Sequence, residues 1–114
     1  MNEILKQTLL YDFYGELLTE HQKEIYEQVV LEDYSLSETA KDAGISRQGV
    51  HDMIKRCTKT LEGYEEKLHL VEKFMSVKEK VHDINTLLEN YEEEDEKELI
   101  IKVRKLTGEI IEEL

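Results

Sequence analysis

The chain has 114 residues, of which 37% are charged, and its formal net charge is −12. It contains one cysteine and no apolar run near the ~20 residues that span a bilayer, and its first residues lack the pattern of a secretory signal. This composition excludes an internal disulfide and a zinc site built from cysteines, and we expect a cytoplasmic protein without a membrane span. The absence of proline and the abundance of Lys, Glu, Leu and Ile predict an all-α fold.

Two amphipathic helices are predicted at the start of the chain. The second of them covers roughly residues 20–32, with Ile25, Val29 and Val30 on its buried side. It follows Thr19 and Gln22, whose spacing is that of a capping box. The first helix, over residues 3–18, has its apolar stripe at Ile4, Leu5, Leu9, Phe13, Leu17 and Leu18.

The middle of the chain has the layout of a helix-turn-helix. Ser35 and Glu38 repeat the capping-box spacing before a short helix over residues 36–43. Gly44 suits the left-handed position that follows a helix, and Ser46 is a good cap for a second helix. The second helix of such a unit can lie in a DNA major groove, with its first turns against the base edges.

The second helix of this unit is a basic island in an acidic protein. Over residues 46–60 four basic side chains stand against Asp52 alone, which gives a net charge of +3. Its buried stripe is expected at Val50, Ile54, Cys57 and Leu61. Arginine pairs well with guanine and glutamine with adenine, and basic residues further along would hold phosphates. The candidate nucleic-acid-binding residues are Arg47, Gln48, His51, Lys55, Arg56 and Lys59.

The last part of the chain predicts helical packing rather than a second globular core. A continuous helix is expected over residues 63–91, followed by an acidic run over 92–96 and an amphipathic helix over 97–114. The apolar residues of the long helix alternate in steps of four and three, as in a coiled coil. We favour a homodimer over folding back within the chain, with the contact residues Leu70, Phe74, Val77, Val81, Ile84 and Leu88.

These elements divide the chain into two predicted domains. A helix-turn-helix domain covers residues 1–62, with the helix-turn-helix unit itself at about 35–60. An acidic helical extension covers residues 63–114 and is expected to serve dimerisation or packing.

The sequence from Leu17 to Arg56 resembles the region of bacterial sigma factors that reads the −35 promoter element. Both have an L-T-x-x-Q opening, an S-L-x-E-x-A first helix and a G-I-S-R start of the second helix. A closer resemblance is to the YlxM (UPF0122) family of small bacterial proteins. The segments that carry it are YGELLTE at 14–20, ISRQGVHDMIKR at 45–56 and LEGYEEKL at 61–68.

The resemblance implies a sigma-region-4-like helical bundle followed by a long helix and a C-terminal helix. Genes of this family tend to neighbour those of the signal recognition particle GTPases, which implies a regulatory role in that pathway. The implied partners are DNA or the particle's RNA, and proteins of the particle. Two functions stay open: a nucleic-acid-binding regulator, and a protein-interaction module that acts on particle components through its acidic helical surface.

We do not expect an enzyme, a metal site or a cofactor. The four histidines are scattered along the chain, and no Gly-rich loop could cradle a phosphate. Cys57 falls on the apolar stripe of the second helix, which predicts a buried and unreactive thiol.

Overall fold

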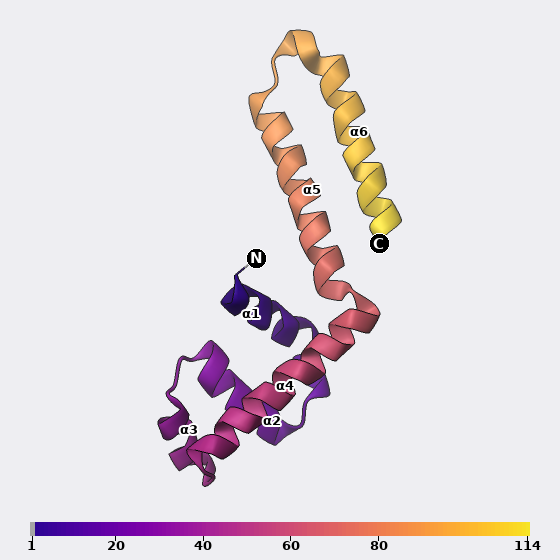
Figure 1. Cartoon of the computed structure of the whole chain (residues 1–114). Helices are drawn as coiled ribbons and strands as arrows, with labels where there is room; N and C mark the ends of the chain where they lie inside the picture. Colours follow the sequence, from indigo (N-terminus) through magenta and orange to yellow (C-terminus); the bar gives the residue numbers. More distant parts are fainter. Residues whose placement is uncertain (1) are drawn as a thin grey trace. The chain divides into compact units, whose positions relative to one another are not determined.

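The computed structural model of this protein is built from α-helices (Figure 1). It describes residues 2–114, apart from the side chain of residue 94. The described residues contain no strand, which confirms the all-α prediction. The helices are α1 (Glu3–Tyr14), α2 (Glu20–Tyr26), α3 (Leu36–Ala43), α4 (Arg47–Leu68), α5 (Leu70–Asn90) and α6 (Glu96–Glu113).

Three short helical turns join or extend these helices. A 3-10 turn over Gly15–Leu17 ends α1, and a second over Glu93–Asp95 precedes α6. The predicted helix over residues 20–32 continues past α2 as a π-helical turn over Glu27–Leu31. The chain divides into two compact units, one up to Val71 and one over residues 72–114. None of the described helices is both apolar enough and long enough to cross a membrane.

The first helix of the helix-turn-helix and the start of the second lie where predicted, but the second helix continues past residue 60 to Leu68. The Ser35 hydroxyl accepts the Glu38 N–H at 3.1 Å and opens α3, and the Ser46 hydroxyl accepts the Gly49 N–H at 2.9 Å and opens α4. Between the helices, Gly44 has a φ of 70°, a left-handed conformation that side chains disfavour. The turn and the two helix starts therefore depend on Gly44 and on the two serines that predicted them.

α4 is the central element of the first unit, and α1, α2 and α3 all pack on it. Val50, Cys57 and Leu61 are fully buried, as the stripe predicted, and Ile54 is half-buried. Around Val50 the core contains Ile25 and Ala40 from the two preceding helices. This packing turns the opposite side of α4 to the surface.

The predicted stripe of α1 is wrong for most of its members. Ile4, Leu5, Phe13 and Leu17 are exposed, and the side chains that α1 buries are Leu10 and Tyr14. Burying Tyr14 is favourable because its hydroxyl finds partners: it donates to Glu65 Oε1 at 2.6 Å and accepts the Leu70 N–H at 3.1 Å. A prediction that counts only apolar residues misses a buried tyrosine whose hydroxyl has hydrogen-bond partners.

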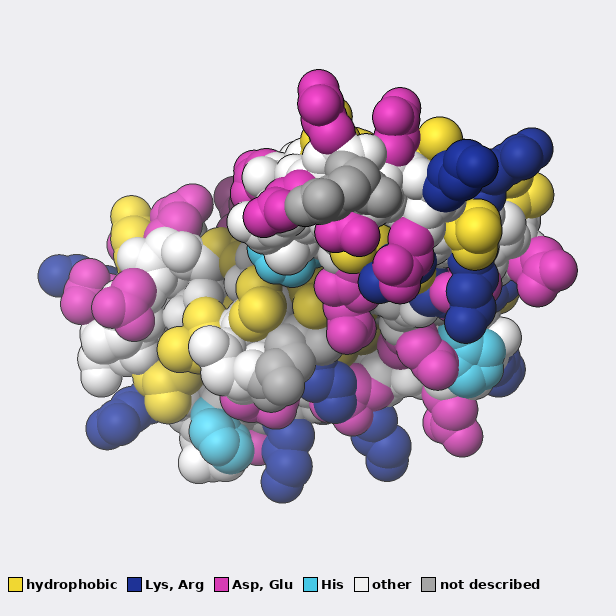
Figure 2. All heavy atoms as spheres, turned by 90° about the horizontal axis from the view of Figure 1, so that it is seen from above, with side chains coloured by type: hydrophobic (Ala, Val, Ile, Leu, Met, Phe, Trp, Pro, Cys, Tyr) yellow, Lys and Arg dark blue, Asp and Glu magenta, His cyan; other side chains and the backbone are white. Residues whose placement is uncertain are grey.

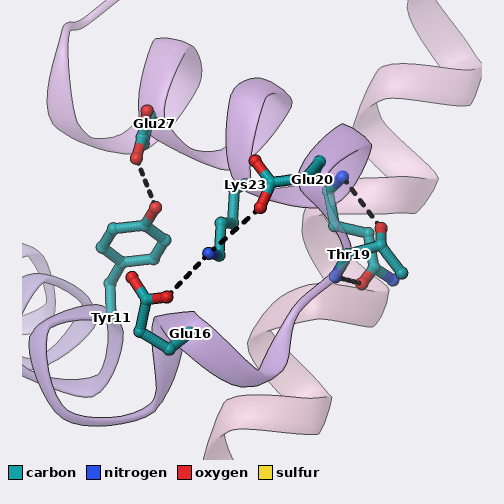
Figure 3. A network of polar contacts seen from close by, with 7 residues as sticks. Tyr11, Glu16, Thr19, Glu20, Lys23 and Glu27 are labelled. Carbon is teal, nitrogen blue, oxygen red and sulfur yellow. Dashed lines mark hydrogen bonds and ion pairs between the residues drawn. The ribbon is translucent and has the colours of Figure 1, made fainter.

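A polar network joins α1 to α2 (Figure 3). The Thr19 hydroxyl accepts the Gln22 N–H, and the Gln22 side chain accepts the Thr19 N–H, so the predicted capping box is confirmed. Lys23 pairs with Glu16 at 3.0 Å, and Tyr11 donates a hydrogen bond to Glu27. The Tyr11 ring also stacks on that of Tyr26, with 5.3 Å between the centroids.

The continuous helix predicted over residues 63–91 is interrupted at His69. This residue ends α4 with a φ of 56°, and α5 starts directly after it. The first N–H groups of α5 need acceptors outside the helix. Tyr14 accepts the Leu70 N–H, and Glu65 accepts the Val71 N–H at 2.9 Å. The interruption is thus stabilised by a contact with α1 that the local sequence pattern does not contain.

The second unit is a helical hairpin in which α6 returns antiparallel to α5 (Figure 1). The Ser76 hydroxyl donates to Glu113 Oε1 at 2.7 Å, and Lys80 forms an ion pair with the same carboxylate. Leu99 of α6 is buried. Of the predicted dimer contacts, Val77 and Ile84 are half-buried, whereas four are exposed: Leu70, Phe74, Val81 and Leu88.

Candidate nucleic-acid interface

The six residues predicted to bind nucleic acid all lie within residues 47–59 of α4 and are all exposed. Four of them follow the side of the helix opposite Val50 and Cys57, and Arg47 and Arg56 lie at the edges of that side. Because that buried stripe is packed against α1, α2 and α3, the exposed side is held by the core rather than by a loop. These residues are Arg47, Gln48, His51, Lys55, Arg56 and Lys59.

Asp52 lies among them and contacts two of their side chains. The Gln48 amide donates to Asp52 Oδ1 at 3.0 Å, and His51 Nδ1 lies 3.6 Å from the same oxygen. This bond uses one of the two N–H groups of the Gln48 amide, so a base would meet the other N–H and the amide oxygen. The carboxylate also adds a negative charge to the surface that would meet phosphates.

Three of the predicted residues border one groove. His51, Lys55 and Lys59 line a hollow of about 470 Å³, with Ile54 half-buried at its floor. Its remaining lining comes from Gln7 of α1, and from Thr58 and Glu62 of α4. Arg47 and Arg56 are not among the residues of this groove, although they also lie within residues 47–59 of α4.

Sequence reasoning missed the contribution of Gln7. This residue belongs to α1, and only the packing of α1 on α4 brings it to Lys55 and Lys59. The amphipathic pattern of α1 is a signal that this helix packs, but it does not say against which part of the chain. Gln7 adds a neutral hydrogen-bonding group to a groove that also contains two lysines and Glu62.

The charge of α4 reverses along its length. Residues 47–59 include the four basic residues noted above, whereas Glu62, Glu65 and Glu66 follow toward the C-terminal end. The whole chain carries an excess of acidic residues, and the face in Figure 2 shows Asp and Glu side chains with Lys and Arg side chains among them. The basic residues of α4 are therefore grouped at its N-terminal side and are followed by acidic ones.

Cys57 belongs to the core under this surface. Its side chain is fully buried, and burial raises the pKa of its thiol. A thiol that keeps its proton at neutral pH is a poor nucleophile. The prediction of a buried thiol is therefore confirmed.

Comparison with known proteins identifies the family of this chain. The UPF0122 family, described as "Putative helix-turn-helix protein, YlxM / p13 like", matches residues 1–112. A UPF0122 protein of Thermoanaerobacter sp. (strain X514) is 43% identical over 113 residues, which cover 99% of this chain and 97% of the relative. The UPF0122 protein YlxM of Bacillus subtilis (strain 168) is 41% identical over 96 residues, 84% of this chain and 87% of the relative. The chain belongs to the UPF0122 family of YlxM-like helix-turn-helix proteins.

Proposed function

We propose that this protein is a nucleic-acid-binding regulator whose α4 enters the groove of a duplex. The observation that carries the proposal is the placement of a basic, exposed surface on the second helix of a helix-turn-helix, within a protein of net charge −12. In such units this helix contacts base edges with its N-terminal residues. Arg47 and Gln48 occupy the first turn of α4 and would be the base-contacting residues.

The lysines further along α4 are the proposed phosphate contacts. Lys55 and Lys59 lie one turn apart and border the same groove, so a backbone passing over α4 would meet both ammonium groups. Contacts of this kind supply affinity without reading sequence. Lys67 belongs to the same helix but lies beyond its acidic residues.

A salt titration tests the proposal. Labelled duplex DNA and, separately, the RNA of the signal recognition particle are titrated with the full chain at several salt concentrations. The particle's RNA is included because of the family resemblance alone. Each lost phosphate contact reduces the log–log salt slope by about 0.9 on B-DNA. We expect that reduction for Lys55→Ala and Lys59→Ala.

Lys67→Ala is the matched control, because it removes the same charge from an exposed position of the same helix. It should leave the slope unchanged, whereas an equal change in all three variants would indicate only an effect of net charge. Unchanged slopes for both Lys55→Ala and Lys59→Ala on both nucleic acids would exclude the groove-binding proposal.

The position of Asp52 favours a second candidate function. Its carboxylate contacts the side chains of both Gln48 and His51. Acidic residues begin at Glu62, about one turn after Lys59. A mixed surface of this kind suits a protein partner, and the acidic helices could present charge to a basic one. In this alternative the protein acts on components of the signal recognition particle. Absence of salt-dependent binding to either nucleic acid would favour it.

A further inference from the structure

We propose that a second copy of this chain covers one open side of the α5–α6 hairpin, so that the two hairpins form an antiparallel four-helix bundle. The inference concerns residues 72–114 and does not depend on the proposed nucleic-acid interface. It starts from the small number of buried apolar side chains in this unit. Among the described side chains of this unit, Leu99 is the buried one, and large apolar side chains of both helices are exposed. A unit of about 40 residues with so little core usually needs a partner surface.

α6 covers only one side of α5. Glu113 bonds to Ser76 and Lys80 at one end of the hairpin. At the other end, Leu87 and Leu99 line a small hollow of about 170 Å³ next to the turn. These contacts place α6 along the side of α5 that carries Ser76, Lys80 and Leu87.

The neighbouring side of α5 is apolar and exposed. Phe74, Val81 and Leu88 recur at seven-residue steps, the spacing of a coiled-coil seam, and their exposed fractions are 39%, 53% and 49%. Val81 directly follows Lys80, so it points about 100° further around the axis than the residue that pairs with α6. The ammonium of Lys78 lies 5.8 Å from the centroid of the Phe74 ring and so marks the edge of this side.

α6 contributes a second apolar stripe. Ile100 and Ile111 are 49% and 68% exposed, and their separation of about three turns puts them on one side of the helix. Ile100 follows the buried Leu99 and points about 100° further around the axis. In an antiparallel pair the helices wind in opposite senses when viewed from one end. A 100° step from the contact side therefore brings the apolar stripe of α5 and that of α6 to the same side of the hairpin. We call Phe74, Val81, Leu88, Ile100 and Ile111 the open face.

The charges beside the open face suit a second copy. On α5 this edge carries Lys78, followed further along by Glu89, which accepts a hydrogen bond from Asn85 at 3.2 Å. A two-fold axis midway between Lys78 and Glu89 would set two α5 helices antiparallel. It would bring Lys78 of one copy opposite Glu89 of the other, twice in each dimer. Such self-complementarity is what a two-fold interface requires.

Sedimentation of the full chain at tens of micromolar tests this proposal, and we expect the wild type to be a dimer. Two adjacent isoleucines give a matched pair of variants. Ile100→Glu puts a charge into the open face and should weaken dimerisation by about tenfold or more. Ile101→Glu adds the same charge at a position that is 68% exposed and points about 100° further round, away from that face, so it should leave the dimer intact. Circular dichroism checks that both variants stay helical.

A charge exchange tests the antiparallel arrangement. Lys78→Glu and Glu89→Lys should each weaken the dimer by up to about fivefold, and the double variant should restore it. A monomeric wild type would overturn the proposal, as would equal effects of Ile100→Glu and Ile101→Glu. A double variant weaker than either single one would overturn the antiparallel pairing.

Discussion

Tyr14 and Glu65 lie 51 positions apart in the sequence and join through a hydrogen bond of 2.6 Å, from the phenol to the carboxylate. The same two side chains accept the first two N–H groups of α5, those of Leu70 and Val71. One pair of polar side chains therefore links α1 to α4 and also caps α5. The Tyr14 ring is fully buried, so its hydroxyl has no alternative partner in water.

Tyr14→Phe should lower the free energy of unfolding by about 1–3 kcal/mol, because it leaves the Leu70 N–H without its acceptor and removes one bond to Glu65. Urea denaturation followed by circular dichroism measures the change. Tyr34→Phe is the control, since the Tyr34 side chain is exposed, and its effect should stay within about 0.5 kcal/mol. Equal effects of the two variants would mean that the Tyr14 hydroxyl contributes nothing specific.

Stability should fall at alkaline pH. Burial, followed by the hydrogen bond to a glutamate, raises the pKa of Tyr11 and of Tyr14 above the ordinary value of 10.0. The unfolded chain then loses these protons at a lower pH than the folded chain does. Their contribution is complete below about pH 10 and is lost as the pH rises toward the folded pKa.

Urea midpoints measured between pH 8 and pH 11 check this dependence. Tyr11→Phe and Tyr14→Phe should each make the alkaline decrease shallower than in the wild type, whereas Tyr34→Phe should reproduce the wild-type curve. A wild-type midpoint that stays constant to pH 11 would contradict the expectation.

Gly44→Ala should destabilise the first unit by about 1–2 kcal/mol, because the left-handed backbone at φ 70° disfavours a side chain. Gly63→Ala should have the opposite sign. Gly63 lies within α4 with open space around its Cα, so alanine should stabilise the helix by about 0.5–1 kcal/mol. Thermal unfolding of the two variants measures both signs, and a Gly44→Ala protein as stable as the wild type would refute the role given to this turn.

Asp52→Asn should strengthen binding to nucleic acid by about threefold at low salt, since it removes one negative charge from among the proposed contact residues of α4. The asparagine oxygen can still accept the Gln48 hydrogen bond, so the local structure is kept. Asp83→Asn makes the same change of net charge on an exposed position of α5. Fluorescence anisotropy that shows equal affinities for the two variants would rule out a specific effect of Asp52.

The sequence predicted best the features that depend on neighbouring residues. The caps at Thr19, Ser35 and Ser46 and the turn at Gly44 need only local backbone geometry, and all four are confirmed. The buried stripe of α4 followed from helical periodicity, which also put the six candidate binding residues on the exposed side.

The features that the sequence did not predict depend on contacts between distant parts of the chain. The interruption at His69 depends on Tyr14 and Glu65, and periodicity alone continued the helix through it. The participation of Gln7 in the groove depends in the same way on the packing of α1 against α4. The heptad pattern of α5 does not reveal that α6 packs along α5. This packing is what adds two isoleucines of α6 to the open face.

The reversal of charge along α4 has a directional consequence. A polyanion over Lys55 and Lys59 would be attracted by them, but it would meet Glu62 about one turn and Glu66 about two turns beyond Lys59. In the proposed binding mode, these acidic residues would limit how far a phosphate backbone can shift along α4. In this proposed role the acidic residues determine the position of binding, while the basic residues supply its strength.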